Sequence, residues 1–240
     1  MKAELYKMWK IPGKRVMLVL LLVLPSLEII QHLLMNQQVE MQKSLTQLYF
    51  LSGSSRGHII QMVLLWALPM YFVYLVGSDH GLYERTYYKY VLYSRKGAKH
   101  YLHMRLCFAF FTGFMVMIGA LMIDMILVTV LFMSKAPMSH GNPPFYEYVL
   151  YMVVASVITG LLCLLGECAG YLFKSQRYIY PLLTVLWFVL IYAHPSIMYL
   201  FQPYTEYSLT YAFPIFMVLL ILTLSSVIGV IVYEKKKPYD

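Results

Sequence analysis

The sequence is poor in charged residues, which make up 12% of its 240 residues, whereas hydrophobic residues make up 60%. A soluble domain carries about 25% charged residues, so this chain has too few to cover a surface that faces water. The mean hydropathy is +0.65, and several apolar runs approach or exceed the ~20 residues that a helix needs to cross a bilayer. We therefore predict an all-α, multi-pass protein of the cell (inner) membrane.

Several motifs of known chemistry are also missing. The sequence contains no G-x-x-x-x-G-K-[ST] phosphate loop, H-E-x-x-H pair or G-x-S-x-G elbow. It is therefore not expected to bind ATP by that loop or to be an enzyme. The three cysteines, Cys107, Cys163 and Cys168, lie in or beside apolar runs, which implies no disulfide framework. His100 and His103 have a spacing that is poor evidence for a metal, and we predict none.

Six apolar runs are candidate transmembrane helices, at about residues 16–35, 59–77, 106–133, 148–173, 179–194 and 211–233. If both termini are cytoplasmic, the cytoplasmic segments hold 16 of the 19 lysines and arginines, as the positive-inside rule predicts. A wrong helix count would scramble this alternation. Topology therefore accounts for the net charge of +8, and no nucleic-acid partner is predicted. The chain is predicted to be a single transmembrane domain over 1–240.

Three segments between these runs carry further information. Residues 1–15 combine an apolar stripe with lysines, which favours an interfacial elbow helix over a plain basic flank, and Pro12-Gly13 ends it. Residues 194–214 contain Pro195, Pro203 and Pro214 and no lysine or arginine. This pattern fits an outer re-entrant stretch or an ordinary apolar outer loop.

Residues 78–105 form the longest predicted cytoplasmic segment, and helical spacing divides part of it into two faces. The apolar face consists of Tyr87, Tyr88, Val91 and Leu92, and the basic face of Arg85, Lys89 and Lys96. The segment is either a tyrosine-rich interface anchor or a docking element for a cytoplasmic partner.

Three acidic residues fall within the apolar runs: Glu28, Asp124 and Glu167. Each costs about 2.5–3.5 kcal/mol at the middle of a membrane helix, so such side chains usually face the bundle or a cavity. We interpret them as structural hydrogen-bonding groups or as candidates for the lining of a substrate path. Gly166 and Gly170 have the four-residue spacing that lets membrane helices approach closely.

The layout resembles the permease subunits of type-two ABC exporters. The resemblance rests on Lys2-Ala-Glu-Leu-Tyr-Lys, on a first span that contains Pro25, and on the broken stretch 194–214. It also rests on the segment before the third span, with its basic entry from Lys99 to Arg105. The matching residues of that segment are Gly81, Glu84, Arg85, Tyr93, Ser94 and Arg95.

The resemblance implies a chain that pairs with a second permease chain, identical or related, and with two separate cytoplasmic ATPase subunits that hold ATP and Mg. It places the ATPase-coupling residues at Glu84, Arg85, Tyr87, Tyr88, Lys89, Val91, Leu92, Arg95 and Lys96. The implied substrate is a hydrophobic or amphipathic molecule such as a peptide toxin, bacteriocin or antibiotic, moved in export or in self-immunity. Three alternatives stay open: an ion-gradient-driven secondary transporter, a non-transporting membrane anchor or sensor subunit, and, with least support, an intramembrane enzyme.

Overall fold

The computed structural model describes residues 6, 9–26, 70–76, 98–132, 145–172, 181, 183–185, 187–189, 192 and 209–236. Every one of these residues except Ile11 is helical, so the predicted all-α class is confirmed for the described part of the chain. The predicted spans at 106–133, 148–173 and 211–233 coincide with long helices. The second part of the span at 16–35, most of the span at 59–77 and half of the span at 179–194 lie outside the described residues.

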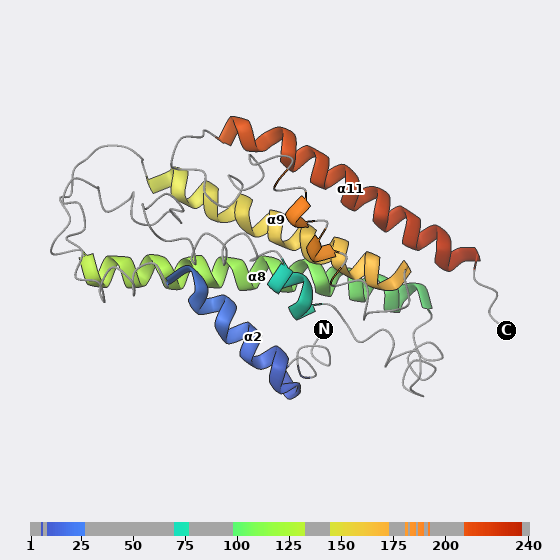
Figure 1. Cartoon of the computed structure of the whole chain (residues 1–240), viewed down its shortest axis with the longest axis horizontal. Coiled ribbons are helices and arrows are strands. Elements are labelled where there is room, and N and C mark those ends of the chain that lie inside the picture. Colours follow the sequence, from blue (N-terminus) through green and yellow to red (C-terminus); the bar gives the residue numbers. More distant parts are fainter. Residues whose placement is uncertain are drawn as a thin grey trace.

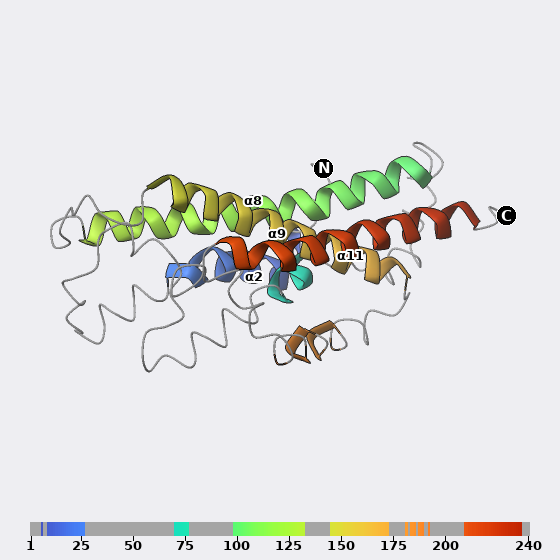
Figure 2. The same ribbon diagram turned by 90° about the horizontal axis from the view of Figure 1, so that it is seen from above.

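Three long helices dominate the structure: α8 (Ala98–Phe132), α9 (Phe145–Leu172) and α11 (Leu209–Lys236). They lie side by side in both views of Figures 1 and 2. Each contains a segment long and apolar enough to cross a membrane, namely His100–Leu131, Phe145–Leu172 and Phe216–Glu234. Because α8 has 35 residues, it is about 52 Å long, well beyond the ~30 Å hydrocarbon core.

The helices α8 and α9 are antiparallel and closely packed. A Cβ atom on Gly113 would lie 2.6 Å from the Cys163 Sγ, and one on Gly160 would lie 2.9 Å from the Phe110 ring. Closer to the C-terminus of α8, the Tyr148 hydroxyl of α9 donates a hydrogen bond of 3.0 Å to the Leu121 carbonyl of α8. Each glycine therefore leaves room for a side chain and a backbone carbonyl of the other helix at a place where a Cβ atom would not fit.

Two shorter helices join this bundle. Helix α2 (Pro12–Val23) continues into the 3-10 helix η1 (Leu24–Ser26), whose three residues are all buried. Figure 1 shows α2 crossing α8 obliquely, and Leu22 of α2 lies close to Gly119 of α8. A helical segment at Met70–Val76 packs into the same core through Phe72, Leu75 and Val76.

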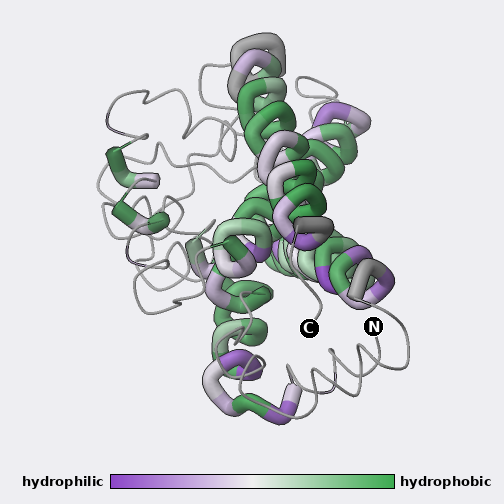
Figure 3. The backbone as a smooth tube through the Cα atoms, turned by 90° about the vertical axis from the view of Figure 1, so that its right-hand side faces the viewer, coloured by the Kyte–Doolittle hydropathy of each residue, from purple (hydrophilic) through white to green (hydrophobic). Residues whose placement is uncertain are grey.

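Large apolar side chains cover the outer faces of the described helices. On α11, Ile221 is 63% exposed and Val218 and Ile228 are similar, while Val130 of α8 is 73% exposed. Figure 3 shows that these helices are hydrophobic along most of their length. Contiguous exposed apolar surface is rare on soluble monomers. Together with the three candidate spans, it indicates a membrane protein whose lipid-facing surface these residues form.

Three helix boundaries differ from the sequence prediction. Ala98–Arg105, the last eight residues of the predicted loop 78–105, belong to α8; no glycine or proline follows Gly97 there, so nothing ends the helix. Helix α11 begins at Leu209, inside the predicted stretch 194–214, so Pro214 is the sixth residue of that helix. Pro12 begins α2 directly after the extended residue Ile11, a position that suits proline.

Candidate functional site

A buried ion pair joins α8 to α9 near the end of the bundle that holds Ala98, Leu172 and Lys236, called here the Ala98 end. The Arg105 guanidinium donates two hydrogen bonds to one carboxylate oxygen of Glu167, from Nε at 3.1 Å and from Nη2 at 2.9 Å. The two side chains are 5% and 3% exposed. A pair so deeply buried loses most of its hydration and depends on this geometry to recover the cost.

A second polar contact attaches α11 at the same end. The Tyr171 hydroxyl of α9 donates a hydrogen bond to the carboxylate of Glu234 on α11, and Glu234 is only 3% exposed. The Tyr171 and Tyr233 rings meet edge to face, with centroids 6.4 Å apart. A small apolar cluster from the three helices packs at the same end: Leu102, Leu106, Cys168 and Val230. We call the four residues Arg105, Glu167, Tyr171 and Glu234 the polar cluster.

Gly166 contacts the Met70–Val76 segment beside the polar cluster. A Cβ atom at Gly166 would lie 2.4 Å from Cγ1 of Val73, so the glycine leaves a notch that the valine fills. Gly166 directly precedes Glu167, the partner of Arg105. Two neighbouring residues of α9 therefore hold both Met70–Val76 and the first turns of α8. These are the two described segments on either side of residues 77–97.

Comparison with known proteins places the chain in a family. No family model matches it, and no solved structure does. It is 30% identical, over an alignment of 254 residues, to a Bacillus subtilis (strain 168) protein that bears the name Uncharacterized protein YybM. The alignment covers 98% of this chain and 98% of that protein. The chain belongs to the YybM family. The match extends over nearly the whole length of both proteins.

The predicted site residues of this YybM-family chain fall into two groups. Glu28 and the predicted coupling residues from Glu84 to Lys96 lie outside the described residues. Glu167 belongs to the polar cluster, whereas Asp124, 3% exposed, stands nineteen residues after Arg105 on α8. That separation is about 28 Å along the helix. Asp124 and Glu167 therefore lie toward opposite ends of the bundle and cannot act on one group together.

The predicted packing residues also have defined positions in the YybM-family fold. Gly166 is buried against Val73, and Gly170 is half-buried one turn further along α9. Gly113, which the sequence reasoning did not single out, makes an equally close contact with α9. Ala109 and Gly113 are four residues apart, and this spacing of small residues was the signal that could have identified it.

Sequence reasoning also missed three members of the polar cluster. The sequence prediction places Arg105 among the many basic residues that fix the topology and assigns no role to Tyr171 or Glu234. The signal was available for Arg105, because it and Glu167 occupy the same ends of two successive, antiparallel spans. Among the described residues, no group of three or more His, Cys, Asp or Glu side chains is arranged to hold a metal ion.

Proposed function

We propose that this chain is the transmembrane permease subunit of an ATP-driven ABC exporter. In this proposal it has six transmembrane helices, both termini in the cytoplasm and the Ala98 end at the inner face of the cell membrane. A second permease chain completes the pathway. Separate cytoplasmic ATPase subunits bind ATP and Mg and carry out the hydrolysis, so this chain is not itself an enzyme. The cargo is a hydrophobic or amphipathic molecule.

One observation supports this proposal above the others: both sides of the proposed coupling segment attach to one point of α9. Val73 fills the notch at Gly166, and Arg105 binds Glu167. A force applied by an ATPase to residues 84–96 would therefore reach α9 from two directions. The orientation is supported by the 16 of 19 basic residues that this topology puts in the cytoplasm.

The polar cluster gives the proposed mechanism a physical basis. ATP binding can shift a transporter between two states only if the partner contacts the two states differently. In our proposal the ATPase closes on the coupling segment and displaces the first turns of α8. The Arg105–Glu167 ion pair transfers that displacement to α9, and the Tyr171–Glu234 hydrogen bond transfers it to α11. Helices α8, α9 and α11 then all move in response to the contact between the ATPase and the coupling segment.

The gradient-driven alternative gains no specific support from the site. It needs acidic side chains that bind and release an ion along one pathway. Glu167 already has the buried cation Arg105 as its partner. Asp124 lies about 28 Å from Arg105 along α8. We therefore advance the exporter alone.

The first test is affinity purification of the tagged full chain from its native cells in mild detergent, followed by mass spectrometry. We expect a soluble protein with an ATPase phosphate loop to co-purify. Reversing the charges of Arg85 and Lys89 should abolish that association. Recovery of the chain without any ATPase, combined with transport in vesicles that lack ATP, would overturn the proposal.

A double variant distinguishes the docking of the ATPase from the transmission of its movement to the membrane helices. Arg105→Met with Glu167→Leu replaces the buried pair by apolar side chains and leaves residues 84–96 unchanged. We expect this double variant to retain the ATPase in the same purification but to lose the stimulation of ATP hydrolysis by substrate. If the double variant kept full stimulation, the ion pair would have no part in coupling.

A further inference from the structure

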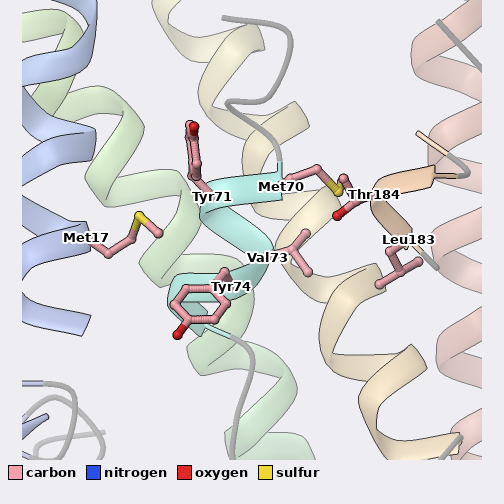
Figure 4. Close-up of a pocket in the computed structure, with 7 residues that line it drawn as sticks. All are labelled: Met17, Met70, Tyr71, Val73, Tyr74, Leu183 and Thr184. Carbon is pink, nitrogen blue, oxygen red and sulfur yellow. The ribbon is translucent and has the colours of Figure 1, made fainter. Parts of the chain in front are cut away.

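A pocket of about 350 Å³ lies between α2, the Met70–Val76 segment and the helical residues Leu183 and Thr184. Figure 4 shows Met17 reaching toward it from α2, and Leu183 and Thr184 on the other side. The segment between them supplies Met70, Val73 and two tyrosines. The pocket is therefore assembled from three parts of the chain that are far apart in the sequence.

The lining determines the chemistry of a ligand. No charged side chain is among the described residues that form the pocket, while three of them, Tyr71, Tyr74 and Thr184, carry hydroxyl groups. Methionines line two sides, and their flexible thioethers adapt to apolar shapes. A volume above ~300 Å³ with mostly apolar walls and a few polar groups is typical of small-molecule sites. The matching ligand is uncharged, with an apolar body and a hydrogen-bonding group.

The position of the pocket links it to the polar cluster. Val73 lines the pocket and also fills the notch at Gly166, next to the ion pair. A molecule in the pocket would therefore press on the residue that holds Met70–Val76 against α9. Neither Asp124 nor Glu167 lines this pocket, although the sequence made both of them candidates for a substrate path.

We propose that this pocket binds an uncharged amphipathic small molecule, and that such molecules are the substrate class of the exporter. The substrate assignment rests on the proposed function, whereas the binding itself does not. Binding can be measured on the permease chain alone, without an ATPase. A failure of the exporter proposal in the purification experiment would therefore leave the binding result intact, and the reverse also holds.

The test is photolabelling of the purified full chain in phosphatidylcholine nanodiscs with a diazirine derivative of octanol, an uncharged amphipath. Labelled residues are located by mass spectrometry, with unlabelled octanol as competitor. We expect saturable labelling of Tyr71 and Tyr74. Thr184→Trp, which fills the pocket, should reduce that labelling to background. Val185→Trp is the matched control, because Val185 is 60% exposed and does not line the pocket, and it should label like the unaltered chain.

A second filling variant, Met17→Trp, places a tryptophan in the pocket from α2. It tests the pocket if Thr184→Trp does not fold. Gel filtration and circular dichroism report whether each variant is folded. Loss of saturable labelling in a folded Thr184→Trp or Met17→Trp variant, with labelling kept in Val185→Trp, supports the site. Labelling that does not saturate, or that is equal in the filled and control variants, would mean that octanol reaches these tyrosines from the lipid, and the proposal would fail.

Discussion

Replacement of Arg105 by methionine should destabilise the chain strongly. The variant removes both donors to the Glu167 carboxylate, at 2.9 and 3.1 Å, and leaves that side chain, 3% exposed, without its cation. Removing one partner of a buried pair costs about 3–5 kcal/mol, whereas replacing both by apolar residues is often neutral or stabilising. We expect Arg105→Met to lower the free energy of unfolding by about 3–5 kcal/mol, and the double variant with Glu167→Leu to recover most of it.

Titration of SDS into the purified chain in detergent micelles, followed by far-UV circular dichroism, measures these differences. Arg15→Met is the control, because Arg15 is an exposed arginine, and it should cause a smaller loss. A cost below about 1 kcal/mol for Arg105→Met is the value typical of an exposed pair. That result, or a double variant no more stable than the single one, would refute the reasoning.

Three further predictions concern the packing of the bundle, and they are tested in the same unfolding assay or by thiol labelling. Gly166→Val should lower the free energy of unfolding by about 1–3 kcal/mol because its side chain would overlap Val73. Gly229→Val is the control, because Gly229 has open space around it, and it should not cause this loss. Equal losses in the two variants would contradict the contact between Gly166 and Val73. Tyr148→Phe removes one buried hydrogen bond to α8 and should cost about 0.5–1.5 kcal/mol. In the folded chain, a membrane-permeant maleimide should modify the exposed Cys107 and leave the two buried cysteines unmodified until the chain unfolds.

Hydropathy predicted the long helices well because burial in a bilayer demands a continuous apolar run. It could not predict where those helices begin. The transfer free energy that defines an apolar run says nothing about Lys99 or His100, which can lie in a helix outside the hydrocarbon. The prolines of the stretch 194–214 show a similar limit. Proline ends many helices, but its effect depends on its distance from the helix start, which composition does not supply.

The polar cluster shows a different limit of sequence reasoning. The buried ion pair joins two residues, Arg105 and Glu167, that are 62 positions apart. The sequence around one of them does not indicate the other. Glu167 was noticed because an acidic residue in an apolar run is rare, whereas Arg105 stood in a basic flank where arginine is expected. Matching residues by their depth in successive spans would have brought the two together. Tyr171 carries no comparable signal, because tyrosines are common throughout this sequence.

The close approaches at Gly113 and Gly160 restrict how the bundle can move. Helix backbones that touch cannot slide past each other without opening a gap, and interiors packed at this density resist such gaps. The middle parts of α8 and α9 therefore behave as one rigid unit. Helix α11 packs against it near its start, where Phe216 and Leu219 join the core, and near its last turns, where Val230 is buried and Tyr171 binds Glu234. In the transport cycle that we propose for this chain, spin labels in the middle parts of α8 and α9 should keep a constant separation.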